Sequence, residues 1–99
     1  MKEVPAFLTP LDQKDPQFAQ RVAELIGFAQ ADGALDAKTK TLMSLLADAV
    51  LGHPEGVAAI AGRARQQGAS EEEIAETVRI AFMSGGVPAL VTGLRAFRQ

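Results

Sequence analysis

The chain has 99 residues, a formal net charge of −2 and no cysteine, and its isoelectric point is about 5.3. The lack of cysteine excludes disulfides, thiol redox chemistry and thiolate–metal sites. The weakly acidic balance gives no electrostatic basis for binding nucleic acid or an anionic membrane. The length and an apolar fraction of 47% predict one globular domain.

The N-terminal residues 1–5 lack a charged segment followed by an apolar run, so we expect no secretory signal. No apolar run reaches the roughly 20 residues that are needed to cross a bilayer. These two observations predict a soluble, cytoplasmic protein with no membrane segment.

Residues 1–14 contain two prolines and no clear apolar period, and we interpret them as an irregular N-terminal arm. The single all-helical domain is then expected over residues 15–99. Because Phe7, Leu8 and Leu11 are apolar, we expect the arm to pack against its own domain or a neighbouring subunit.

Apolar residues recur at helical spacing along the rest of the chain, whereas no stretch alternates with the period of two that a strand requires. The pattern predicts an all-α bundle of about five helices with short connections. The expected helices cover residues 16–31, 36–51, 54–67, 70–84 and 88–98.

Capping residues set the expected ends of these helices. Asp15, Asp36 and Ser70 are expected N-caps, and Ser70 with Glu73 three residues later forms a capping box. The glycine pair at residues 85–86 is expected to break the fourth helix.

The stretch from Leu51 to Gly56 is expected to form an elbow between two helices, and it holds the only histidine of the chain. Gly52 can adopt the left-handed conformation that closes a helix. Pro54 keeps His53 out of helical geometry and itself suits the first position of the next helix.

A resemblance to a known superfamily is carried by three segments in this order: LDAKTKTLMSLLADAVLG, GASEEEIAETV and AFMSGGVPAL. The chain resembles the carboxymuconolactone decarboxylase-like superfamily, which includes the alkylhydroperoxidase D-type proteins, over roughly residues 17–97. The resemblance implies a helical bundle that assembles as a symmetric homo-oligomer, a trimer or a hexamer. The positive mean hydropathy of +0.08 agrees with apolar surface left to bury.

The thiol peroxidase branch of this superfamily has a glutamate, a Cys-x-x-Cys pair and a histidine at its site. The resemblance places these residues at Thr41, at His53 and Gly56, and at Ile60, so that all four differ in this chain. Thiol peroxidase activity is therefore not expected, because the nucleophilic sulfur is missing.

The decarboxylase branch often has a Gly-x-Pro-Glu elbow, which the residues from Gly52 to Glu55 resemble. That branch typically keeps a histidine at the position of Ile60. The match to this branch is closer, but it is incomplete at the residue that would carry acid–base chemistry.

His53 and Glu55 are the candidate catalytic residues, because a neutral imidazole in a cleft can act as a general base and a nearby carboxylate can assist it. The alternative is that both are ordinary residues of a solvated helix start. Thr41, Gly56, Ile60, Phe82 and Met83 are the candidate pocket residues. We expect no cofactor and no metal, since one histidine with scattered acids, such as Asp48, gives no ligand spacing.

Two functions follow from these residues. The first is an enzyme that performs acid–base chemistry on a small organic acid or lactone through His53. The second is a catalytically silent helical oligomer that binds a small molecule or a partner protein.

Overall fold

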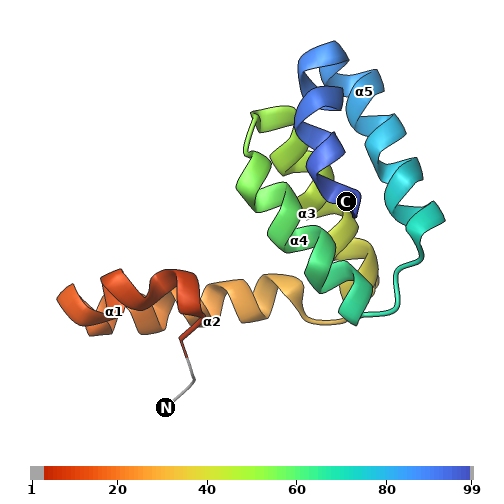
Figure 1. Cartoon of the computed structure of the whole chain (residues 1–99). Coiled ribbons are helices and arrows are strands. Elements are labelled where there is room, and N and C mark those ends of the chain that lie inside the picture. The colour runs from red at the N-terminus through yellow and green to blue at the C-terminus, as the bar shows by residue number, and fades with distance from the viewer. Residues whose placement is uncertain (1–3, 99) are drawn as a thin grey trace. The chain divides into compact units, whose positions relative to one another are not determined.

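The computed structural model describes residues 4–98, and all regular secondary structure in this range is helical (Figure 1). The predicted all-α class is therefore confirmed. The chain divides into two compact units, the first ending at Asp32 and the second beginning at Gly33. The elements are η1 (Ala6–Leu8), α1 (Thr9–Lys14), α2 (Pro16–Gln30), α3 (Ala37–Leu51), α4 (Pro54–Gln66), α5 (Glu71–Gly93) and η2 (Leu94–Ala96).

The first unit consists of α1 packed against α2, with the short 3-10 turn η1 before them. The prediction of an irregular arm is wrong for residues 6–14, which are helical. Pro10 lies in the first turn of α1, where its missing N–H breaks no helical hydrogen bond, so it helps to start the helix. Residues 1–3 lie outside the described range, and the domain boundary expected between residues 14 and 15 stays a prediction.

The first unit buries few side chains. Helix α2 begins as predicted, because the Asp15 carboxylate accepts a hydrogen bond from the Phe18 N–H at 3.1 Å. The buried residues of this helix are two alanines, Ala19 and Ala23. The large apolar side chains that stay exposed in this unit are Phe7, Phe18, Leu25 and Phe28.

The second unit begins with α3 and α4, whose ends lie close to the predicted ones. The Asp36 side chain caps α3 by accepting a hydrogen bond from the Thr39 N–H at 2.8 Å. Gly52 ends α3 in the left-handed conformation, with φ of 80°, and Pro54 occupies the first turn of α4. The predicted elbow between these helices is confirmed.

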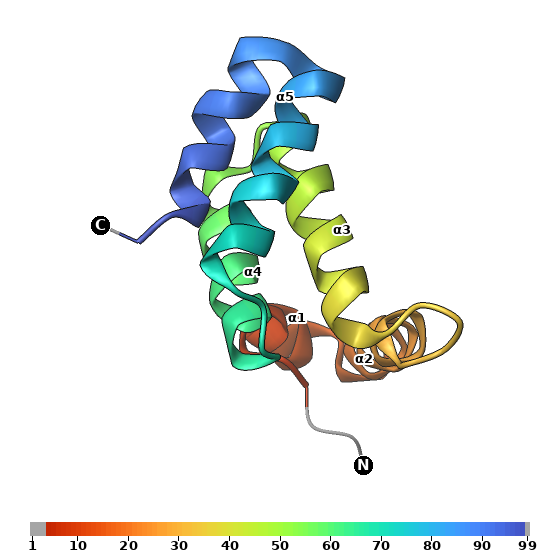
Figure 2. The same ribbon diagram turned by 90° about the vertical axis from the view of Figure 1, so that its right-hand side faces the viewer.

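Helix α5 begins with the predicted capping box, in which the Ser70 hydroxyl and the Glu73 carboxylate each accept a backbone N–H. Gly86 interrupts it with φ of 74° and ψ of −161°, and the ribbon reverses direction there (Figures 1 and 2). Helix α5 is therefore a hairpin of two arms. The separate helix predicted over 88–98 is shorter than expected, because regular α-helix ends at Gly93 and the 3-10 turn η2 follows.

The two arms of α5 approach each other closely at two glycines. A Cβ atom placed on Gly93 would lie 3.2 Å from Cγ1 of Val78 on the first arm. A Cβ atom placed on Gly85 would lie 2.7 Å from Cβ of Ala89 on the second arm. Both glycines therefore permit the contact that closes the hairpin.

By length and composition alone, the segment Glu71–Ala96 is long and apolar enough to cross a membrane. The backbone break at Gly86 divides it into two arms that run in opposite directions. Each arm is shorter than the roughly 20 residues that a single span requires. The geometry of α5 is that of a packed hairpin and not of one continuous spanning helix.

The core of the second unit is built mainly from alanine, and its largest fully buried side chains are those of Leu45, Ile74, Val57 and Thr41. Small side chains let α3, α4 and α5 approach closely, although each contributes less burial energy than a leucine.

Ion pairs of Lys38 and Arg65 join the helix ends of this unit. Lys38 on α3 donates to Glu73 on α5 at 2.9 Å. Arg65 on α4 donates two hydrogen bonds of 2.7 Å to the Glu71 carboxylate and a third, of 2.8 Å, to the backbone oxygen of Ala96. Arg65 therefore connects α4 with both ends of the α5–η2 segment.

Candidate functional site

The histidine at the elbow is held by the last turn of α3. The backbone N–H of His53 donates to the backbone oxygen of Asp48 at 2.9 Å, and that of Gly52 donates to Ala49 at 3.3 Å. These two bonds form a Schellman motif, which places the residue after the left-handed glycine beside the residue five positions earlier. The end of the helix therefore brings the side chains of His53 and Asp48 together.

His53 Nδ1 lies 3.1 Å from Oδ1 of Asp48, with side-chain exposures of 59% and 24% respectively. When Nδ1 carries the proton, it donates to the carboxylate and leaves a lone pair on Nε2. A carboxylate on one ring nitrogen fixes the tautomer and orientation of the imidazole. The pair can therefore present Nε2 as an oriented proton acceptor.

The Asp48 carboxylate also lies against the first turn of α4. A Cβ atom placed on Gly56 would overlap Oδ2 of Asp48 and would lie 3.0 Å from its Cγ. The positive end of the α4 dipole favours a negative charge at this place. Gly56, the position to which the resemblance assigns the second cysteine, thus leaves room for the carboxylate that pairs with His53.

The other candidates of the elbow lie elsewhere. Glu55 is exposed in the first turn of α4, and in residues 4–98 it forms no ion pair with His53, whose carboxylate partner is Asp48. Thr41 is buried, and its hydroxyl donates to the backbone oxygen of Ala37 at 2.9 Å. Ile60 is partly buried against the core.

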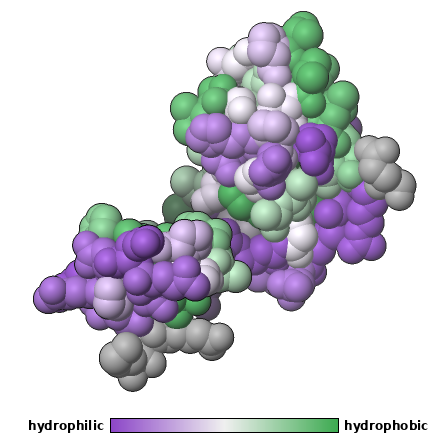
Figure 3. Space-filling model, turned by 60° about the vertical axis from the view of Figure 1, so that its left-hand side comes forward, coloured by the Kyte–Doolittle hydropathy of each residue, from purple (hydrophilic) through white to green (hydrophobic). Residues whose placement is uncertain are grey.

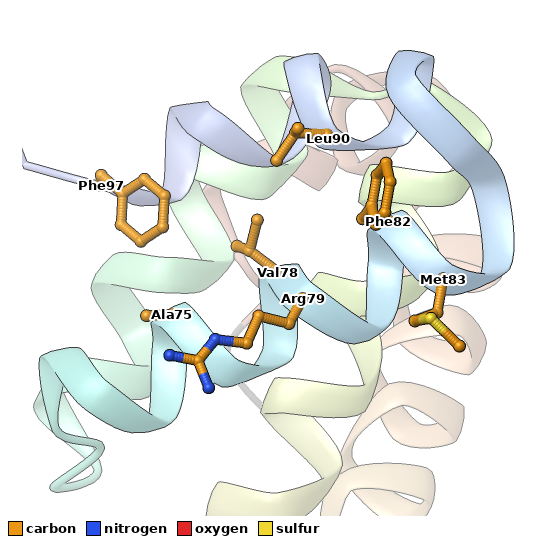
Figure 4. Close-up of a pocket in the computed structure, with 7 residues that line it drawn as sticks. All are labelled: Ala75, Val78, Arg79, Phe82, Met83, Leu90 and Phe97. Atoms are coloured by element: carbon orange, nitrogen blue, oxygen red, sulfur yellow. The ribbon is translucent and has the colours of Figure 1, made fainter.

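An apolar pocket of about 500 Å³ lies between the two arms of α5, and the residue after η2 lies at one end of it (Figure 4). Phe82 and Met83 belong to its lining, whereas Thr41, Gly56 and Ile60 do not, and the functional role expected for these five residues stays a prediction. The lining residues are Ala75, Val78, Arg79, Phe82, Met83, Leu90 and Phe97.

A smaller hollow of about 170 Å³ lies between α3 and α5 and is lined by Thr39, Leu42, Met43, Leu46, Thr77 and Ile80. Several large apolar side chains of the second unit are half exposed or more, among them Met83 at 78%. Figure 3 shows hydrophobic residues gathered along the margin of the upper body, which is the second unit. This unit therefore leaves considerable apolar surface uncovered.

Among the described residues, no group of three or more histidine, cysteine, aspartate or glutamate side chains is arranged to hold a metal ion. Of the polar residues at the elbow, Asp48 and His53 form one oriented pair and Glu55 supplies one exposed carboxylate. Their geometry suits proton transfer better than metal coordination.

The titratable groups with clear shifts in residues 4–98 belong to the ion pairs that join the helices and to the cap of α3, where hydrogen bonds from Thr39 lower the pKa of Asp36. Hydrogen bonds from Arg65 lower the pKa of Glu71, and the same contact raises the pKa of Arg65. The pKa of Glu73 is lowered by the backbone N–H of Ser70 and then by Lys38, whose own pKa the Glu73 carboxylate raises. These shifts mark structural contacts of the helix ends.

The sequence pointed to His53 but missed its partner Asp48 and most of the pocket. The signal for Asp48 is the glycine that closes α3, because a Schellman motif pairs residues 48 and 53. The pocket has no comparable signal, since Leu90 and Phe97 reach Phe82 only after the chain reverses at Gly86.

Residues 16–99 match the family model described as the carboxymuconolactone decarboxylase family. The structure is also similar to a crystal structure of the apo form of a carboxymuconolactone decarboxylase family protein from Legionella pneumophila, with a TM-score of 0.85 and 28% sequence identity. That similarity covers 90% of this chain and 80% of the other. A comparison with curated proteins finds no match. The chain therefore belongs to the carboxymuconolactone decarboxylase family.

Proposed function

We propose that the protein is an enzyme that performs acid–base chemistry on a small organic acid or lactone. His53 is the acid–base group, and Asp48 positions its ring. The observation that supports this proposal best is the 3.1 Å contact between His53 Nδ1 and Asp48 Oδ1, at an elbow whose Gly-x-Pro-Glu sequence resembles the decarboxylase branch.

In this proposal, Nε2 of His53 accepts a proton from a carbon next to a carbonyl group, or passes it to a leaving oxygen. A positioned general base of this kind contributes roughly 10²- to 10⁴-fold to the rate. Asp48 stabilises the imidazolium that forms, because its carboxylate faces Nδ1. Glu55, exposed in the next turn of the chain, is the candidate second acid–base group.

The proposal includes a homo-oligomer, a trimer or a hexamer, as the resemblance implies. His53 is 59% exposed in the single chain, and a general base works better where water is excluded. The exposed apolar side chains of the second unit outside the pocket lining, Val87 and Val91 among them, supply surface for contacts between copies. The cytoplasmic location expected from the sequence stays a prediction.

Steady-state kinetics on a panel of lactones and keto acids test this proposal. We expect wild-type turnover of at least one compound, a loss of kcat of about 100-fold or more in His53→Gln, and a smaller loss with an altered pH profile in Asp48→Asn. Glu55→Gln tests the second carboxylate, and Glu24→Gln, an exposed residue of α2, is the matched control. Turnover by His53→Gln at the wild-type rate, or no turnover of any compound by the wild type, contradicts the proposal.

The second candidate function is a catalytically silent oligomer that binds a small molecule. The apolar pocket of about 500 Å³ between the arms of α5 favours it, because His53, Asp48 and Glu55 are absent from its lining. A wild-type protein that binds ligands but turns over nothing in the panel supports this candidate over the first.

A further inference from the structure

The pocket between the arms of α5 has a single charged group in an otherwise apolar lining. Every lining side chain except that of Arg79 is apolar, and two of them, Phe82 and Phe97, are aromatic. Figure 4 shows the Arg79 side chain running along the first arm toward Ala75, so its guanidinium group lies at one edge of the pocket. The pocket therefore combines a long apolar wall with one cationic end.

Arg79 is exposed, and its side chain takes part in none of the ion pairs found in residues 4–98. Two acids lie on the same arm, Glu76 three residues earlier and Glu72 a further turn away, and neither pairs with it. Arg65, in contrast, gives a bidentate contact to Glu71. The planar donor fork of Arg79 thus remains available for an anion, and a carboxylate matches that fork bidentately.

We propose that this pocket binds an amphipathic monocarboxylate. Its apolar body lies against Phe82, Leu90 and Phe97, and its carboxylate accepts hydrogen bonds from Arg79. A volume of about 500 Å³ suits a medium-length acyl or aryl chain, since pockets for small molecules generally measure ~300–1,000 Å³. This inference rests on the second candidate function, small-molecule binding, and adds the chemical class of the ligand.

Isothermal titration calorimetry on the full chain tests this inference, because the absence of Trp and Tyr removes intrinsic fluorescence as a sensitive probe. The probes are decanoate, 1-decanol and decyltrimethylammonium, which share a tail and differ in head group. We expect decanoate to bind about tenfold more tightly than decanol, and the cation to bind most weakly, because a hydrogen bond to a charged group is worth this factor.

Three variants separate the head-group contact from the tail contact. Arg79→Gln is expected to weaken decanoate binding about tenfold and to leave decanol binding unchanged. Ala75→Leu narrows the pocket and is expected to weaken both ligands. Arg95→Gln, which changes an exposed arginine outside the lining, is the matched control and is expected to bind like the wild type.

Equal binding of decanoate and decanol, unaffected by Arg79→Gln, overturns the carboxylate class but leaves small-molecule binding in place. No binding of any probe to the wild type overturns both. Light scattering on the variant Phe82→Asp is an independent check. A particle smaller than that of the wild type would mean that the pocket lining is a contact between copies of the chain, and this result also overturns the inference.

Discussion

Asp48, His53 and Gly56 act together although they belong to the end of α3, the elbow and the start of α4. By sequence distance, the carboxylate nearest to His53 is that of Glu55, but the first turn of α4 leaves this side chain exposed. The Schellman motif instead folds His53 back over Asp48. The histidine could be predicted from its uniqueness and its elbow, whereas its partner depends on backbone hydrogen bonds that spacing along the chain does not display.

A comparison of Gly56→Ala with Gly62→Ala tests the role of Gly56. Both glycines lie within α4, but a Cβ atom at Gly62 meets nothing within 4 Å, whereas one at Gly56 overlaps Asp48. Alanine at Gly62 should stabilise the protein by about 0.5–1 kcal/mol, since glycine is the poorer helix former.

Alanine at Gly56 should leave the protein about 1 kcal/mol less stable than Gly62→Ala. The reason is that the Asp48 carboxylate must move away from His53 and from the first turn of α4. Urea denaturation measures the difference, and NMR of the single imidazole reports whether His53 loses its partner. Equal stabilisation by both substitutions with an unchanged imidazole spectrum would show that Asp48 does not depend on the space at Gly56.

At the scale of the secondary-structure elements, the capping residues were predictable and the shape of α5 was not. Asp15, Asp36 and Ser70 each cap the helix that the sequence assigned to them, because capping is local chemistry between neighbouring residues. The glycine pair also marked the break in α5. The direction in which the second arm of α5 continues, however, depends on the backbone angles of Gly86 and on the close contact of Gly93 with Val78, which no local pattern encodes.

Gly86→Ala should destabilise the second unit through its backbone and not through a clash. Space for a Cβ atom exists, since the nearest heavy atom is Cδ of Pro88 at 3.8 Å. The angles φ of 74° and ψ of −161° lie in a region that is essentially restricted to glycine, at a cost of roughly 1–3 kcal/mol for other residues. Chemical denaturation should show a loss of this size, and Ser84→Ala, a change at an exposed position of the same helix, should show little. A loss no greater in Gly86→Ala than in Ser84→Ala would mean that α5 tolerates other geometries at its turn.

At the scale of the whole molecule, the fold class and the family followed from the order of the helices and their caps. The candidate site is less accessible to sequence reasoning, because the pocket between the two arms of α5 combines residues that no periodicity groups together. Residues 6–14 are helical where the sequence predicts an irregular segment, because a proline in the first turn of a short helix resembles a proline in an irregular segment. What the sequence predicts well is local, and what it misses here depends on tertiary packing.

The ion pairs between helix ends give the second unit a stability that depends on pH in a defined direction. The pKa of Glu71 is lowered, chiefly by hydrogen bonds from Arg65, which also holds the backbone oxygen of Ala96. A carboxyl group whose pKa is lower in the folded state stabilises the protein above its unfolded pKa. That contribution is lost as the pH falls through the folded value. Stability should therefore be level from about pH 7 to about pH 5 and should decline below about pH 4.5, near the unfolded pKa of glutamate.

Glu71→Gln should lower the free energy of unfolding at neutral pH, because the contact with Arg65 is weakened. It should also make the decline of stability in acid shallower, because one of the carboxyl groups that take up a proton is gone. Glu72→Gln is the matched control, since Glu72 lies in the same first turn of α5 and belongs to no ion pair in the described part of the chain. Urea denaturation at half-unit steps between about pH 3 and pH 7 measures both profiles. An acidic decline as steep in Glu71→Gln as in Glu72→Gln would mean that the contact between Arg65 and Glu71 does not control the acid response, and that Glu73 with Lys38 or the Asp36 cap does.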